Sequence, residues 1–160
     1  MKVLGVTDED FINYYQPCMY ICMPFCTFKC DKESGGCYCQ NSALAKAKPL
    51  QLNMTALIER YIANPITKAI CFSGLEPFEQ YDELIEFIRI LRDEYHCGDT
   101  VIIYTGFYEH ELTKEISELS KYKNIIVKFG RFIPNNNKHF DEVLGVYLAS
   151  DNQYAKNIGV

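Results

Sequence analysis

The sequence has no long hydrophobic run and no excess of positive charge. No uninterrupted apolar stretch in its 160 residues approaches the roughly 18 residues that a membrane-spanning helix needs, so no membrane anchor is expected. The formal net charge of -5 argues against general nucleic-acid binding, which depends on lysine and arginine contacts to phosphates. The N-terminal run MKVLGVTDEDF lacks a long apolar segment and a small-residue cleavage site. We therefore expect no signal peptide and a cytoplasmic location.

Histidine is scarce, and repeats and linkers are lacking. His96, His110 and His139 are scattered among polar residues, and no two of them have metal-ligand spacing. Hydrophobic residues make up 48% and charged residues 23%, which is ordinary for a globular chain. We therefore expect a single domain over residues 1–160. A solvated basic face is expected from Lys121, Lys123, Lys128 and Arg131.

Apolar patterns predict strands that alternate with helices. Short apolar or β-branched runs predict strands at 19–25, 69–72, 100–104, 124–129 and 142–149. Helical spacing of apolar residues predicts helices at 54–64, 79–95 and 110–121, and the polar run 31–36 is expected to be a loop. This alternation indicates an α/β fold with a mainly parallel sheet, and four or five strands would form only a partial (βα) barrel. The segments that follow the first three strands should then meet at one sheet edge.

Cysteine is abundant: six of the eight cysteines lie between residues 18 and 39. In a reducing compartment such clusters are more often metal or iron–sulfur ligands than disulfides. Cys26, Cys30, Cys37 and Cys39 could bind structural zinc as four thiolates, or three of them could hold a 4Fe–4S cluster with one open iron. Some could also be small buried hydrophobic residues, which is the interpretation favoured for the remaining four cysteines: Cys18, Cys22, Cys71 and Cys97.

Several short motifs occur in a characteristic order along the chain. They are CTFKC at 26–30, CQNSA at 39–43, SGLEP at 73–77, YTGF at 104–107, VKFGRF at 127–132 and SDNQ at 150–153. Together they resemble the radical S-adenosylmethionine (radical SAM) family, and more closely the activating proteins of anaerobic ribonucleoside-triphosphate reductases. The resemblance covers nearly the whole chain.

The resemblance implies a 4Fe–4S cluster and S-adenosylmethionine (SAM) as cofactors. Cys26, Cys30 and Cys39 would hold the cluster; Cys39 is favoured because it precedes QNS, and Cys37 is the alternative. The resemblance places the other cofactor-binding residues at Tyr38, Gln40, Ser73, Gly74, Glu76 and Thr105. No catalytic side chain is expected, since the cofactor carries the chemistry.

The implied activity is reductive cleavage of SAM and formation of a glycyl radical on a partner. That partner would be an anaerobic ribonucleoside-triphosphate reductase, with a one-electron donor such as flavodoxin. The alternatives are a radical SAM enzyme that acts on another glycyl-radical enzyme or a small molecule, and a non-catalytic iron–sulfur or zinc interaction module.

The sequence departs from the family pattern at three places. The run DKESGGCY lengthens the gap after Cys30, Leu75 replaces the second glycine of the usual Gly-Gly-Glu segment, and Phe129 replaces an aspartate. A side chain at position 75 would crowd a loop in which the backbone approaches the ligand.

Overall fold

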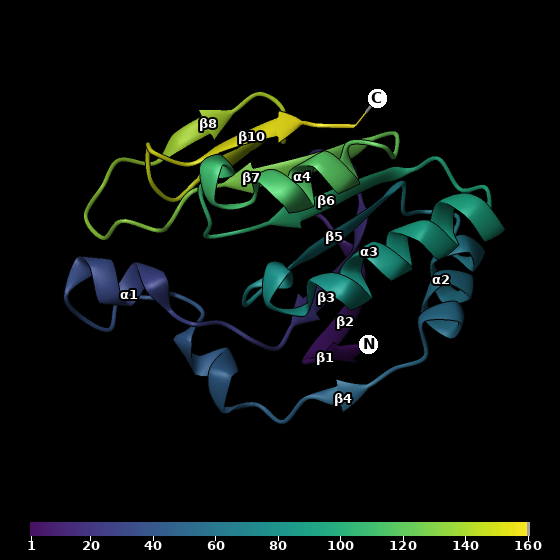
Figure 1. Ribbon diagram of the computed structural model, residues 1–160, viewed down its shortest axis with the longest axis horizontal. Coiled ribbons are helices and arrows are strands. Elements are labelled where there is room, and N and C mark those ends of the chain that lie inside the picture. The colour runs from purple at the N-terminus through teal and green to yellow at the C-terminus, as the bar shows by residue number, and fades with distance from the viewer. Residues whose placement is uncertain (160) are drawn as a thin grey trace.

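A six-stranded, mainly parallel sheet forms the centre of the protein. The computed structural model describes residues 1–159 (Figure 1). The sheet order is β10-β7-β6-β5-β3-β2, in which the four inner strands are parallel and the two edge strands antiparallel. The strands are β2 (Gly5–Asp10), β3 (Cys18–Met23), β5 (Ala69–Gly74), β6 (Thr100–Tyr104), β7 (Ile125–Phe129) and β10 (Tyr154–Asn157). The α/β class and the mainly parallel sheet are confirmed, whereas the partial barrel is not.

Three helices cover one face of this sheet: α2 (Met54–Ala63), α3 (Tyr81–Arg89) and α4 (Thr113–Leu119). The Asn53 side chain accepts a hydrogen bond from the Ala56 amide and caps α2. The predicted helix at 79–95 has three parts: the end of a 3-10 turn, η2 (Pro77–Gln80), then α3, then a π-helical turn, η3 (Ile90–Glu94). The helical pattern was therefore correct, but it did not reveal the changes in hydrogen-bond spacing.

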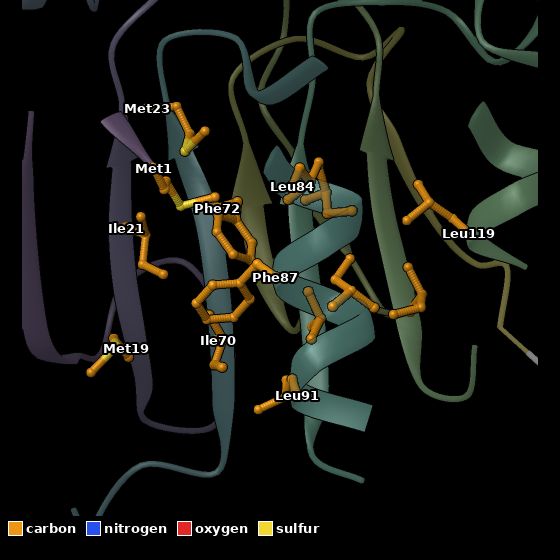
Figure 2. Close-up of a cluster of buried hydrophobic side chains, with 14 of the residues drawn as sticks. Met1, Met19, Ile21, Met23, Ile70, Phe72, Leu84, Phe87, Leu91 and Leu119 are labelled. Carbon is orange, nitrogen blue, oxygen red and sulfur yellow. The ribbon is translucent and has the colours of Figure 1, made fainter. Parts of the chain in front are cut away.

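The main core lies between these helices and the sheet (Figure 2). The rings of Phe72 on β5 and Phe87 on α3 meet edge to face, with centroids 5.1 Å apart. Met19, Ile21 and Met23 on β3 are completely buried on the same side. This layer holds the parallel strands in place, and with them the loops at their carboxyl ends.

The opposite face of the sheet is covered by loops rather than by helices. Tyr14, from the β2–β3 loop, and Leu144 and Leu148, from the segment around a small hairpin, pack over Cys18 and Cys71. Cys18, Cys22 and Cys71 are buried and Cys97 packs against the main core, as expected of small hydrophobic residues. No helix within the described residues 1–159 is long and apolar enough to cross a bilayer.

Two short strand pairs complete the fold. β1 (Lys2–Val3) pairs with β4 (Leu50–Gln51), and β8 (His139–Asp141) pairs with β9 (Val146–Leu148). The predicted strand at 142–149 is therefore mostly wrong, because its first four residues form the turn of the β8–β9 hairpin. Gly145 adopts a φ of 69° and donates its amide hydrogen to the Asp141 carbonyl, 2.8 Å away, which closes this turn.

Candidate functional site

The carboxyl ends of the four parallel strands open into one cavity of about 350 Å³. Its walls come from the cysteine loop after β3, from the residues that end β5 and β6, and from β7, together with the β2–β3 loop and the segment around β9. The predicted meeting of the first three post-strand segments at one sheet edge is confirmed. This is also the edge at which open parallel sheets ordinarily bind their ligands.

Three thiols of the cysteine loop lie on this cavity: those of Cys26, Cys30 and Cys39. Cys37 is exposed and does not line the cavity. Burial raises the pKa of Cys26 to about 11 and also raises the pKa of Cys39, so both thiols are protonated at neutral pH in the metal-free protein. Metal binding would release these protons.

The cysteine loop contains a short helix that the sequence did not predict. Residues Lys29–Ser34 form α1, although 31–36 was expected to be a loop. Gly35 ends α1 in the left-handed conformation, with a φ of 71°. The Asp31 carboxylate then accepts hydrogen bonds from the amides of Tyr38 and Cys39, both at 2.8 Å. These contacts bring Cys39 back toward Cys30 despite the lengthened gap between them.

Asn41 connects the cysteine loop to the end of β5. Its side-chain amide donates a hydrogen bond to the Gly74 carbonyl, 2.7 Å away. Gly74 has a φ of 88°, and a Cβ atom there would lie 2.5 Å from the Cys22 sulfur, so only glycine fits. Sequence analysis had singled out Gly74 but had missed Asn41, which lies within the QNS run.

Glu76 is buried and fixed by three hydrogen bonds. One carboxylate oxygen accepts from the Thr105 hydroxyl at 2.8 Å and the Phe78 amide at 3.1 Å, and the other accepts from the Gly106 amide at 2.9 Å. Burial raises the pKa of Glu76 to about 7, although these donors act in the opposite direction. Glu76 therefore joins the end of β5 to the end of β6, rather than standing in solvent at the start of a helix.

Lys128 is the residue in the cavity wall that sequence analysis misjudged most. Its ammonium group donates hydrogen bonds to the carbonyls of Gly130 at 3.0 Å and Thr105 at 3.4 Å. It forms no ion pair within residues 1–159, and burial lowers its pKa to about 8. The expected basic face is therefore wrong at Lys128 and Arg131, which are buried, whereas Lys121 and Lys123 are exposed. A lysine inside the apolar run IIVKF was the signal available.

Most of the predicted ligand residues lie on this cavity. Gln40, Ser73, Gly74, Glu76 and Thr105 line it together with the three thiols. Tyr38 is 51% exposed and instead lines a second cavity of about 420 Å³, on the other side of the cysteine loop. Leu75 is buried and belongs to the wall of the first cavity, so the cavity forms despite this departure from glycine.

The donor set fits an iron–sulfur cluster better than a single ion. Within residues 1–159, no three His, Cys, Asp or Glu side chains converge closely enough to hold one metal ion. The ligands of a 4Fe–4S cluster each bind a different iron atom and so stand farther apart than those of one ion. Three soft thiol ligands around one cavity match this requirement.

Comparison with known families agrees with this donor set. A model of the 4Fe–4S single cluster domain family matches residues 18–153. The chain belongs to this family. The match extends from β3 through the cysteine loop to the end of the segment before β10, so it includes every cavity wall except the β2–β3 loop. No curated protein and no solved structure matches the chain. As a 4Fe–4S domain, the protein is consistent with redox chemistry, and its metal group is an iron–sulfur cluster.

Proposed function

We propose that this 4Fe–4S domain is a radical SAM activase, which cleaves SAM reductively and generates a glycyl radical on an anaerobic ribonucleotide reductase. The observation that carries the proposal is the single cavity shared by three thiols and a set of buried polar groups from the strand ends. Its volume is within the usual range of small-molecule sites, about 300–1,000 Å³.

Cys26, Cys30 and Cys39 would hold the cluster by three irons and leave the fourth open to a ligand. When bound and reduced, such a cluster would supply one electron to the SAM sulfonium. The bond between sulfur and the 5′ carbon would then break to give methionine and a 5′-deoxyadenosyl radical, which can take a hydrogen atom from a partner glycine. The electron comes from outside the protein, from a one-electron donor such as flavodoxin. The chain itself has to bind and orient SAM and keep water out.

The polar groups of the cavity suit the methionine end of SAM. The Lys128 ammonium is buried and has no ion-pair partner among residues 1–159, so a ligand carboxylate would supply a counter-charge in direct contact. Ser73 and Gly74 line the cavity at the end of β5. The Ser73 hydroxyl can accept from an ammonium, and so can the second lone pair of the Gly74 carbonyl, which already accepts one hydrogen bond from Asn41. Gln40 lies next to Cys39 on the same wall.

Glu76 has a structural part in this arrangement. Because both of its carboxylate oxygens already accept hydrogen bonds from the chain, it holds the Thr105–Gly106 turn against the end of β5. We therefore assign Glu76 and Thr105 to shaping the cavity, while the ligand ammonium is left to the backbone and hydroxyl acceptors.

The proposal is tested with the reconstituted protein and a candidate partner. The protein would be loaded anaerobically with iron and sulfide, reduced with flavodoxin or dithionite, and mixed with SAM and the reductase. We expect 5′-deoxyadenosine together with a glycyl-radical signal in the electron paramagnetic resonance (EPR) spectrum of the reductase. 5′-Deoxyadenosine without that signal would indicate that the enzyme cleaves SAM but acts on another protein or on a small molecule. A full, reducible cluster that yields neither product would contradict the proposal and favour a non-catalytic module.

A further inference from the structure

Helix α1 carries Cys30 but has no place in the hydrophobic core. None of its residues, Lys29–Ser34, is buried, and it lies apart from α2, α3 and α4 (Figure 1). It begins after Phe28 and ends at Gly35, both in the left-handed conformation. Hydrophobic burial therefore does not fix its position, and contacts of another kind must do so.

Ionic contacts converge on α1 from Arg131, in the segment that follows β7. The Arg131 side chain is 5% exposed, and its two terminal nitrogens each donate a hydrogen bond of 2.7 Å to the Glu111 carboxylate. Its Nε lies 2.9 Å from the carboxylate of Glu33 on α1. The guanidinium group also stacks on the Tyr108 ring, 4.7 Å from the ring centroid.

Glu111 extends this network to the other end of α1. Its carboxylate accepts a hydrogen bond from the Lys29 ammonium at 3.3 Å and another from the Tyr108 amide at 2.8 Å. The Lys29 ammonium also lies 4.4 Å from the centroid of the Phe107 ring. Cys30 therefore stands between two residues, Lys29 and Glu33, that are both tied to the same arginine–glutamate pair.

We propose that Arg131 is the positioning residue of the cysteine loop, which holds Cys30 in place for the cluster through Glu33 and Glu111. This inference rests on the cluster ligands of the proposed function, but not on SAM cleavage. Arginine is suited to the task because its planar fork can hydrogen-bond one carboxylate with two nitrogens while the third stays near a second carboxylate. The Nε of Arg131 makes no hydrogen bond within the described residues, so its contact with Glu33 is an ion pair held by charge alone. A lysine could not reproduce both contacts.

The contact between Arg131 and Glu33 is open to salt, as is the Lys29–Glu111 contact, whose lysine side chain is 44% exposed. The Glu33 side chain is 56% exposed, whereas that of Glu111 is 22% exposed. Salt should therefore weaken the link to α1 before it weakens the Arg131–Glu111 pair. Loosening α1 would let Cys30 move away from its iron, so the rate of iron loss should report on this contact directly.

The test compares Glu33→Gln with a matched control, Glu86→Gln. Glu86 is a similarly exposed glutamate, 46% by side chain, paired with Arg89 on α3, far in sequence from the cysteine loop. Each reconstituted protein would be mixed anaerobically with an iron chelator, and the release rate followed between about 0.05 and 1 M sodium chloride. The thermal midpoint of each metal-free protein would be measured as well.

We expect Glu33→Gln to release iron about fivefold faster than wild type at low salt, the upper range for one partly exposed ion pair. Glu86→Gln should match wild type, and the two variants should have similar thermal midpoints. Salt should accelerate release from wild type but have less effect on Glu33→Gln. Arg131→Lys should retain the charge yet release iron faster than Glu33→Gln.

Equal release rates for Glu33→Gln and Glu86→Gln would overturn the inference, as would wild-type behaviour of Arg131→Lys. A protein that keeps its cluster but does not cleave SAM would contradict the proposed function and leave this inference intact. The two failures are therefore distinguishable.

Discussion

At the scale of single residues, the cavity is defined by charges that its surroundings do not neutralise. Lys128 has two carbonyl partners but no carboxylate, and Glu76 has three neutral donors but no ion pair within residues 1–159. Burial raises the pKa of the acid and lowers that of the base, and the charge of each partly offsets the shift of the other. Such groups are expected where a charged ligand completes the site.

Lys128→Met should separate ligand binding from stability. Methionine keeps much of the length and apolar stem of lysine but removes the buried charge, so the thermal midpoint should stay the same or rise. SAM binding to the reconstituted protein should weaken by about 10-fold or more, because a charge-assisted hydrogen bond is lost. Equilibrium dialysis with labelled SAM would measure this. Lys121→Met, at an exposed position, serves as the control, and equal affinities in the two variants would exclude Lys128 from the site.

The buried carboxyl of Glu76 should make stability depend on pH. Its folded pKa of about 7 lies above the usual 4.5, so between these values the folded state holds a proton that the unfolded state has released. The free energy of unfolding should therefore fall as pH rises from about 4.5 to 7, by at most about 1.4 kcal/mol per unit of pKa separation. Urea unfolding of the metal-free protein at several pH values would measure it.

Glu76→Gln is the comparison for this pH dependence. Glutamine removes the titration but sets an amide group near the Gly106 amide, so the variant should be less stable at every pH. The informative quantity is the slope of the free energy of unfolding against pH. If Glu76→Gln kept the wild-type fall in stability between about pH 4.5 and 7, another group would be responsible.

At the scale of elements, the junction between β5 and the following loop depends on Gly74. Gly74→Ala would place a Cβ atom 2.5 Å from the Cys22 sulfur in a backbone with a φ of 88°. We expect a loss of about 1–3 kcal/mol from the backbone strain alone, measured by urea unfolding. Gly98→Ala is a suitable control, since no atom lies within 4 Å of its added Cβ and its φ is not positive. Equal stabilities of the two variants would contradict this account of the junction.

At the scale of the whole molecule, the sequence predicted the architecture better than the cysteine loop. Short, nearly continuous apolar runs between helical segments were enough to predict β3, β5, β6 and β7. These strands are buried on both faces, so almost every position in them is apolar. Their order along the chain then predicted the sheet edge at which the site lies. The edge strands β2 and β10 were missed, since β2 is largely polar with no buried residue and β10 has only four residues, one of them buried.

The residues of the cavity wall that belong to a sequence motif were predicted, whereas those whose positions depend on long-range contacts were missed. Ser73 and Gly74 end β5, and Glu76 and Thr105 follow β5 and β6, so their convergence could be inferred from the order of elements. The positions of Lys128 and Arg131 depend on partners 20 or more residues away, such as the Thr105 carbonyl and the Glu111 carboxylate. Helix α1 was missed for the same reason, because its contacts to Arg131 and Glu111 are distant in sequence and none of its residues is buried.

The measurement that tests the central claim most directly is 5′-deoxyadenosine formation by wild type, Cys39→Ala and Cys37→Ala after identical anaerobic reconstitution and reduction. Cys39 lies on the cavity with Cys26 and Cys30, whereas Cys37 is exposed and does not line it. The account predicts product from wild type and Cys37→Ala, and loss of product from Cys39→Ala together with loss of the cluster absorbance. Loss only in Cys37→Ala would contradict the ligand set, and no product from a wild-type protein with a full, reducible cluster would contradict the proposed chemistry.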